Sequence, residues 1–293
     1  MIDAASYGTY APKGIIRTAV DWTRSLPDTW LARRAVIFVR RFVLRRLGGD
    51  PVDVEALGFR MRLRPYANIC EKRMLFTPGT FDTVERATLS ENMREGFTFI
   101  DVGANVGAYA LFVASRAGPT ARILAVEPQP EIYERLIFNI RLNAFPTIKA
   151  VDCAIAEKPG EVTLFLDPNN AGESSLKVVA CSGATPIRVE ARTLLDLIRE
   201  EGFERVDAIK LDVEGAEDLI LEPFLAKAPD HLFPRILILE NGLARWQADL
   251  SGLLAAKGYA LKATTRQNLV FERAQGDGRH GGGDDHGSAS RNR

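Results

Sequence analysis

Short apolar runs alternate with amphipathic stretches from residue 98 to residue 273, and this alternation limits the possible folds of the chain more than any other feature. The apolar runs occupy residues 98–102, 123–127, 149–155, 206–212 and 235–240. Nearly continuous apolar runs are typical of strands that are buried on both faces of a parallel sheet. Strands that alternate with helices predict a doubly wound α/β fold with a mostly parallel sheet.

Three further regions differ from this domain in composition and in their pattern of apolar residues. Residues 1–50 contain nine basic and four acidic residues, and they predict an Arg-rich helical extension. Residues 51–97 have two period-two segments and a helix-like stretch at 82–95, which predict a β/α lead-in packed on the domain at 98–273. Residues 274–293 lack the apolar content needed to offset their ordering entropy, so we expect a disordered tail.

Composition excludes several classes of protein. Basic and acidic residues balance at 38 each, so a global electrostatic attraction to nucleic acid is not expected. The three cysteines form neither a disulfide framework nor a zinc motif. The first residues do not resemble a secretory signal, and no apolar run reaches the roughly 20 residues that span a bilayer. We therefore expect a cytoplasmic protein, with membrane contact, if any, at the periphery.

Residues 30–47 predict a basic amphipathic helix. One side collects Arg33, Arg34, Arg40, Arg41 and Arg45, and apolar residues cover most of the other. Such a helix can lie on an anionic membrane. The alternative is a helix that packs on the catalytic domain and exposes its arginines to solvent.

Four predicted strands end in carboxylates, at Asp101, Glu127, Asp212 and Glu240. In a doubly wound sheet these side chains lie on one edge, where ligands bind. Each carboxylate alone could cap the helix that follows it. Four together favour a ligand site.

The loop from Asp101 to Gly107 follows the first of these strands. Gly103 and Gly107 permit a tight turn and a close approach of a ligand to the backbone. The loop departs from the dinucleotide pattern G-x-G-x-x-G, because Asn105 and Ala108 replace its second and third glycines. With Glu127 placed to accept ribose hydroxyls, the loop indicates a nucleoside-bearing cofactor, either S-adenosylmethionine or NAD.

The segment at residues 210–217 is the most specific one. Lys210 and Asp212 lie on one side of a strand, and Glu214 and Glu217 are expected in the first turn of the next helix. We favour a functional role for Asp212 and Glu214, and a helix-dipole role for Glu217.

Several motifs together resemble the FkbM-type methyltransferases over about residues 97–273. They are Phe99-Ile-Asp-Val-Gly-Ala-Asn-Val-Gly-Ala-Tyr, Glu127-Pro-Gln-Pro, Asn143, Ser174-Ser-Leu, Thr193-Leu-Leu-Asp, Lys210-Leu-Asp-Val-Glu-Gly-Ala-Glu and Leu239-Glu. One departure is Leu221-Glu-Pro-Phe-Leu, where such proteins often have a Lys-Gly pair. The resemblance implies a seven-stranded class I methyltransferase fold. It also implies methyl transfer from S-adenosylmethionine to a hydroxyl of a sugar, glycolipid or polyketide.

The resemblance also implies roles for individual residues. The methionine part of the cofactor would contact Asp101, Gly103, Asn105 and Gly107, the ribose would contact Glu127, and the adenine would contact Asp152, Cys153 and Ala154. An unpaired cysteine such as Cys153 is more commonly a buried small residue.

Methyl transfer to a hydroxyl needs alignment of the reactants and benefits from a base. Asp212 and Glu214 are the candidate bases, with Lys210 and Glu240 as supporting polar groups. His231 is expected in a surface loop. Asp212, Glu214 and Glu240 could hold a divalent metal, but the spacing does not require one, so no metal is predicted.

Two other functions remain open at the level of sequence. A nicotinamide-dependent oxidoreductase would share the fold, but the failed G-x-G-x-x-G pattern argues against it. A non-catalytic cofactor-binding or scaffold protein would use the Arg-rich segment for interaction, but the intact Asp212 and Glu214 argue against this alternative.

Overall fold

A seven-stranded sheet forms the centre of the computed structural model, which describes residues 5–166, 174–175 and 185–274. The strand order is β12-β13-β11-β10-β3-β4-β5, and β13 runs antiparallel to both of its neighbours. The strands are β3 (Thr98–Val102), β4 (Arg122–Val126), β5 (Ile148–Val151), β10 (Ala208–Leu211), β11 (Ile236–Glu240), β12 (Tyr259–Thr264) and β13 (Asn268–Arg273). This order, with one antiparallel strand, confirms the doubly wound, mostly parallel sheet of the class I methyltransferases.

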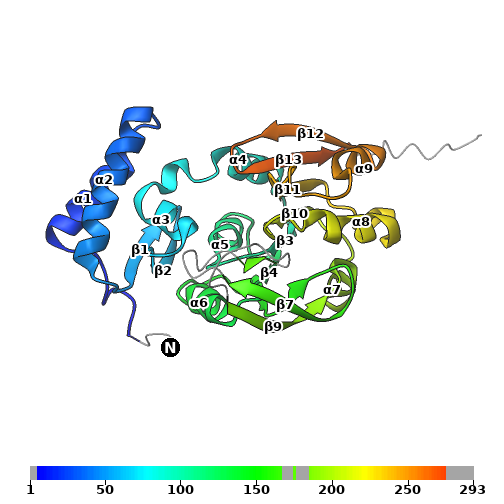
Figure 1. Cartoon of the computed structure of the whole chain (residues 1–293), viewed down its shortest axis with the longest axis horizontal. Coiled ribbons are helices and arrows are strands. Elements are labelled where there is room, and N and C mark those ends of the chain that lie inside the picture. Colours follow the sequence, from blue (N-terminus) through cyan, green and yellow to red (C-terminus); the bar gives the residue numbers. More distant parts are fainter. Residues whose placement is uncertain (1–4, 167–173, 176–184, 275–293) are drawn as a thin grey trace, which may run out of the picture.

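Helices cover both faces of this sheet (Figure 1). They are α5 (Ala108–Ala114), α6 (Pro130–Arg141), α7 (Leu194–Glu200), α8 (Glu217–Lys227) and α9 (Leu250–Ala256). Successive strand residues point to opposite faces, so Phe99 belongs to the core cluster under α5 and α6, whereas Ile100 belongs to the cluster under α7, α8 and α9. Burial on both faces explains why the strands are apolar throughout.

Two helices begin later than the sequence predicts. The helix after β10 starts at Glu217 rather than at residue 214, because Glu214 and Gly215 have φ angles of 56° and 88°, in the left-handed region. The amphipathic stretch at residues 244–257 predicts a helix after β11, but that helix starts only at Leu250, after the Asp249 side chain, which accepts a hydrogen bond from the Gly252 N–H. In both places the residues predicted to form the first turns of the helix form a loop at the carboxyl edge of the sheet instead.

A second, four-stranded sheet is inserted between β5 and α7. It contains β6 (Ala154–Ile155), β7 (Gly160–Leu166), β8 (Ser174–Ser175) and β9 (Thr185–Arg192), in the order β6-β9-β7-β8. The apolar alternation at residues 162–166 and 187–191 predicts an antiparallel insertion, and the antiparallel pairing of β7 with β9 confirms it. The run at 149–155, predicted as one strand, divides instead between the two sheets as β5 and β6.

The N-terminal part packs against one end of the domain. It consists of α1 (Gly14–Ser25), α2 (Trp30–Leu47), the hairpin β1 (Val52–Ala56) and β2 (Phe59–Leu63), α3 (Ile69–Phe76), the 3-10 turn η1 (Pro78–Thr80) and α4 (Thr83–Asn92). Helix α2 has the predicted bounds. Figure 1 shows α1 and α2 side by side at the end of the molecule beyond the hairpin. Val20 and Val43 bury their side chains in the core cluster that also includes β1, β2 and α5.

Within the described residues, no helix combines the length and the apolar character needed to cross a membrane. The tail predicted to be disordered, apart from Ala274, lies outside the described residues.

Candidate functional site

A cavity of about 270 Å³ lies at the carboxyl ends of the central strands. The residues after β3 and β4 form one side, and the residues after β10, β11 and β12 form the other. Residues of the lead-in complete the wall, namely Asn68, Ile69, Cys70, Arg73, Phe81 and Asp82. The site therefore depends on the lead-in as well as on the central sheet.

Asp101, near the end of β3, has one buried carboxylate oxygen without a hydrogen-bond partner among the described residues. Asp101 is only 1% exposed, and its Oδ2 accepts a hydrogen bond from the Ala110 N–H at 3.1 Å. Its Oδ1 is buried and has no hydrogen-bond partner in the described part of the chain. Burial raises the pKa of Asp101 to about 6, although Lys210 lowers it. An unsatisfied buried acceptor on a cavity wall is suited to a cationic or hydrogen-bond-donating ligand.

Gly103 brings this loop against the strand β10. Its φ is 76°, and a Cβ at this position would lie 2.1 Å from the backbone oxygen of Asp212. Only glycine permits this contact, which joins the predicted cofactor loop to the segment that carries Asp212. Gly107 also has a positive φ, 94°, and precedes α5.

Asn105 connects the loop to Glu127. Its backbone N–H donates to Glu127 Oε2 at 2.9 Å, and the Gln129 N–H donates to Glu127 Oε1 at 3.0 Å. The Asn68 side chain in turn donates to Asn105 Oδ1 at 2.9 Å. Burial raises the pKa of Glu127 to about 7, although the two backbone N–H groups lower it. Each Glu127 oxygen keeps a lone pair that could accept a ligand hydroxyl.

The three residues predicted at the adenine have different positions. Cys153 is 1% exposed and Ala154 is 2% exposed, and both line the cavity. Asp152 is exposed and lies outside the cavity lining. Ile155 and Leu164 add apolar surface beside Cys153, which suits a flat aromatic base.

Lys210 and Asp212 form an ion pair inside the cavity. Lys210 is 4% exposed, and its Nζ lies 2.9 Å from Asp212 Oδ2 and 4.9 Å from the centre of the Tyr109 ring. Burial lowers the pKa of Lys210, but Asp212 and Asp101 outweigh burial and hold the pKa above its usual value. Lys210 is therefore a fixed cation that keeps Asp212 oriented.

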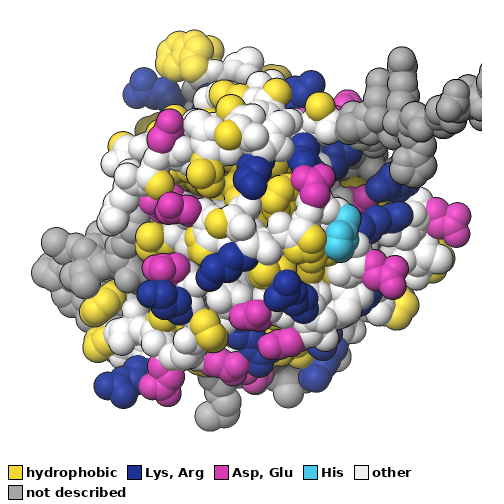
Figure 2. Space-filling view, turned by 90° about the vertical axis from the view of Figure 1, so that its right-hand side faces the viewer, with side chains coloured by type: hydrophobic (Ala, Val, Ile, Leu, Met, Phe, Trp, Pro, Cys, Tyr) yellow, Lys and Arg dark blue, Asp and Glu magenta, His cyan; other side chains and the backbone are white. Residues whose placement is uncertain are grey.

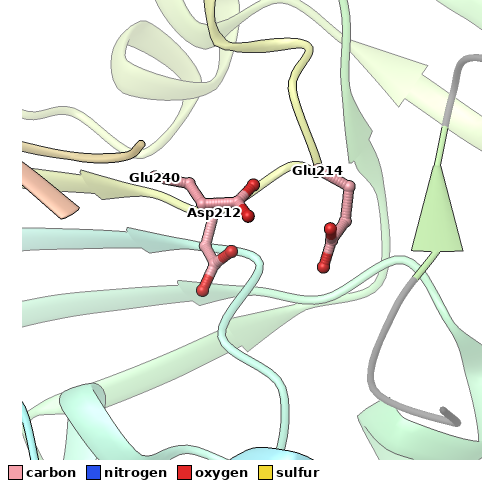
Figure 3. Close-up of side chains that lie close together, drawn as sticks. All are labelled: Asp212, Glu214 and Glu240. Atoms are coloured by element: carbon pink, nitrogen blue, oxygen red, sulfur yellow. The ribbon is translucent and has the colours of Figure 1, made fainter. Parts of the chain in front are cut away.

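Asp212, Glu214 and Glu240 form a cluster of carboxylates (Figure 3), with ligand oxygens within 4.8 Å of one another. Arg245 Nη2 lies 2.7 Å from Glu240 Oε1, and Arg245 Nη1 lies 3.5 Å from Glu214 Oε2. Burial and the nearby Asp212 raise the pKa of Glu240. The cluster has the donor atoms for a hard divalent cation. In this structure a protein cation, Arg245, pairs with two of its three carboxylates, Glu214 and Glu240.

Glu217 supports the loop that carries Glu214. Its side chain is 0% exposed. Its Oε1 accepts from the Val213 and Gly215 N–H groups at 3.2 and 3.3 Å, and its Oε2 accepts from Trp246 Nε1 at 2.7 Å. Glu217 therefore holds the loop in place, which goes beyond the helix-dipole role that the sequence predicts.

Sequence reasoning missed several residues of the site. Asn68, Arg73 and Gln267 come from segments without a motif, and tertiary packing brings them to the cavity. Arg245, also outside the motifs, pairs with Glu214 and Glu240 of the cavity wall. Arg73 pairs with Asp82 at 2.7 Å and also donates to the Gln267 side chain. The sequence carries no spacing signal for these contacts. His231 is exposed in η2 (Asp230–Leu232), outside the cavity lining.

Fold and cavity together define a class I methyltransferase. The sheet has the strand order of that class, and the glycine loop after β3 lies beside Glu127, directly after β4, at the carboxyl edge of the sheet. The methyltransferase FkbM domain matches residues 101–259, and the chain belongs to this family. Family membership assigns S-adenosylmethionine as the cofactor, as the sequence predicts, and removes the oxidoreductase alternative.

Relatives and solved structures are similar over parts of the chain. Methyltransferase sdnD of Sordaria araneosa is 35% identical over 42% of this chain, a match that spans 58% of sdnD. The 2-O-methyltransferase NoeI of Sinorhizobium fredii is 27% identical over 56% of this chain and 70% of its own length. Fibrillarin of Aeropyrum pernix, solved with S-adenosylmethionine, has a TM-score of 0.40 and 14% identity over 64% of this chain and 72% of its own.

The residues present fit S-adenosylmethionine. The unpartnered Asp101 Oδ1 offers an acceptor for the cofactor's charged groups, and the Glu127 oxygens offer acceptors for ribose hydroxyls. The apolar surface at Cys153 and Ile155 is suited to adenine.

Proposed function

We propose that the protein is an O-methyltransferase that methylates a hydroxyl of a sugar, a glycolipid or a polyketide-like small molecule. The observation that carries this proposal is the Lys210–Asp212 pair, which lies in the same cavity as the cofactor loop. Asp212 keeps 40% of its side chain exposed although Lys210 holds its Oδ2. Its Oδ1 is thus available to an acceptor hydroxyl.

In the proposed reaction, the residues of the acceptor side have separate roles. When bound, S-adenosylmethionine supplies a methyl group activated by a sulfonium. Asp212 orients the acceptor hydroxyl and removes its proton, a contribution of about 10²–10⁴-fold in general base catalysis. Lys210 keeps Asp212 fixed, because its Nζ pairs with Asp212 Oδ2 at 2.9 Å. Glu240 and Glu214, clamped by Arg245, form the adjoining polar wall.

The polar character of the acceptor side favours a hydroxyl-rich acceptor. Amide and charged side chains line this side, from the lead-in, the loop after β11 and the turn between β12 and β13, namely Arg73, Asp82, Asn241, Arg266 and Gln267. Carboxylates, amides and guanidinium groups are the groups that hydrogen-bond sugar hydroxyls. The name of NoeI, a 2-O-methyltransferase, is in keeping with oxygen as the accepting atom.

Transfer of an isotopically labelled methyl group from S-adenosylmethionine to a panel of sugars, glycolipids and polyketides tests the proposal. Mass spectrometry is expected to find a labelled methyl ether on one class of acceptor, with release of S-adenosylhomocysteine. Asp212→Asn should lower turnover at least about 100-fold, whereas Glu204→Gln, an exposed control, should not.

Two outcomes would overturn the proposal. Labelled methyl on nitrogen or carbon would contradict O-methylation. Cofactor binding without turnover on the whole panel would favour the non-catalytic alternative.

We also propose that the enzyme works in the cytoplasm. Cys70 and Cys153 are free thiols, as expected in a reducing compartment.

A further inference from the structure

Exposed apolar side chains are concentrated on the two N-terminal helices. Of the eleven large apolar side chains that are exposed in the described chain, seven lie on α1 and α2. They are Ile15, Trp22, Trp30, Leu31, Ile37, Phe38 and Phe42. Scattered exposed apolar residues need no explanation, but a concentration of this kind marks an interaction surface.

The apolar residues of α2 divide between two faces. Val36, Val39, Val43 and Leu47 pack inward against the core. Leu31 and Phe38 are 62% and 67% exposed and lie one above the other on the outer face, seven residues apart. The burial of the inner face already fixes the helix to the domain, so the outer apolar residues do not serve that packing.

Arginines accompany these outer residues. Helix α2 contains six arginines and no acidic residue. Arg34 and Arg46 lie over the rings of Trp30 and Phe42, and within the described residues Arg33 alone among the six forms an ion pair, with Asp28. By contrast, acidic and basic side chains are interspersed at the opposite end of the molecule (Figure 2). The outer surface of α2 therefore combines exposed apolar side chains with charged side chains that are all positive.

We propose that the outer face of α1 and α2 docks on an anionic membrane surface. Aromatic and aliphatic side chains beside arginines are suited to the boundary between lipid headgroups and acyl chains. The arginines would contact lipid phosphates, and Leu31, Phe38 and Phe42 would enter the apolar layer.

Charge argues against a second copy of this chain as the occupant. Two copies meeting through α2 would face six arginines with six more, a like-charge contact that costs free energy. The arginines are also interleaved with exposed aliphatic residues, which a phosphate backbone alone would not require.

Docking would hold the whole enzyme at the membrane, because the helices are attached firmly to the domain. Arg24 of α1 donates to the carbonyl oxygens of Leu75 and Glu55 at 2.8 and 3.0 Å. Helix α3, which contains Leu75, also supplies Ile69, Cys70 and Arg73 to the cavity wall.

Vesicle sedimentation of the full-length protein tests the proposal without any need for turnover. The vesicles contain phosphatidylcholine alone or with about a third of phosphatidylglycerol. We expect binding to the anionic vesicles at least about tenfold tighter than binding to the neutral ones, with loss of affinity as salt rises. The joint variants Phe38→Ser with Phe42→Ser, and Arg34→Gln with Arg41→Gln and Arg45→Gln, should each weaken binding at least about tenfold.

Matched controls use exposed residues elsewhere. Leu261→Ser, and Arg141→Gln with Arg188→Gln and Arg199→Gln, should bind as the wild type does. Circular dichroism checks the fold of every variant. Equal binding by the α2 variants and the controls, tight binding to DNA without binding to vesicles, or dimerisation that Phe38→Ser abolishes would each overturn the proposal.

Discussion

Gly103 shows how one backbone position joins the two halves of the cavity. It has a positive φ, and it lies so close to the Asp212 carbonyl that no Cβ fits. A side chain at Gly103 would cost free energy in two ways, through the strain of a positive φ and through a steric clash. Gly118 serves as a comparison, because a side chain there would cause only the strain. Gly118 has a φ of 80°, and a Cβ at this position would meet no atom within 4 Å.

We expect Gly103→Ala to lower the free energy of unfolding by more than about 3 kcal/mol, because it adds a steric clash to the strain of positive φ. Gly118→Ala should cost about 1 kcal/mol, from the strain alone. Urea denaturation of both variants measures the difference. Equal costs would show that the loop can move away from β10.

The buried carboxyl of Glu127 predicts a pH dependence of stability in the protein without cofactor. Its pKa is raised from 4.5 to about 7 by burial, so the folded state binds a proton more tightly than the unfolded state does. The contribution of Glu127 to the free energy of unfolding is therefore complete below pH 4.5 and is lost as the pH rises through about 7. Asp101 acts in the same direction, with a pKa of about 6.

Glu127→Gln should reduce this loss, whereas Glu131→Gln, at an exposed position on α6, should not. Urea denaturation at about pH 5 and about pH 8 makes the comparison. A Glu127→Gln protein that loses as much stability as the wild type between these pH values would contradict the assignment.

At the scale of elements, the β1–β2 hairpin fixes the N-terminal part through a buried ion pair. Asp53 Oδ1 lies 2.7 Å from Arg62 Nε, with side-chain exposures of 1% and 5%. Asp53 Oδ2 also accepts from the Gly8 and Tyr10 N–H groups at 2.8 and 3.1 Å. The hairpin thus organises the chain that precedes α1.

Asp53→Ala should lower the free energy of unfolding by about 3–5 kcal/mol, because it leaves the buried Arg62 without its counter-ion. The exposed pair Arg17–Asp21 on α1 is the control, and Asp21→Ala should cost less than about 1 kcal/mol. Chemical denaturation followed by circular dichroism measures both. A cost below about 1 kcal/mol for Asp53→Ala would mean that the pair contributes little.

The elements that the sequence predicted well are those defined by apolar periodicity. The strands around Asp101, Glu127 and Asp212 and the helix at 30–47 are such elements, and their local pattern was sufficient. The start of α8 was predicted too early, because the left-handed Glu214 pairs with Arg245, which is distant in the sequence. The start of α9 was also predicted too early, although its Asp249 cap is a local signal that sequence reasoning overlooked. Tertiary packing brings Asn68 to the cavity and Arg245 to Glu240, and no local pattern encodes these contacts.

At the scale of the whole molecule, buried hydrogen bonds join the lead-in to the β12–β13 hairpin. Glu85 of α4 is 1% exposed, and its Oε1 accepts from Asn268 Nδ2 and Thr265 Oγ1, both at 2.7 Å. These residues lie beside the turn that carries Arg266 and Gln267 into the cavity.

Because of these hydrogen bonds and the core that α1 and α2 share with the domain, we expect one cooperative unfolding transition. In a Trp246→Phe variant, tryptophan fluorescence reports on α1 and α2 through Trp22 and Trp30, and circular dichroism reports on the whole chain. The two urea curves should coincide. Separate midpoints would show that the N-terminal part unfolds independently.

The proposed chemistry divides one cavity between a cofactor side at Glu127 and an acceptor side at Asp212. Calorimetric titration with S-adenosylmethionine tests it most directly, on the wild type, Glu127→Ala and Asp212→Asn. We expect Glu127→Ala to weaken binding at least about tenfold, whereas Asp212→Asn should stay within about tenfold of the wild type. Unchanged affinity in Glu127→Ala, or a larger loss in Asp212→Asn than in Glu127→Ala, would contradict the division.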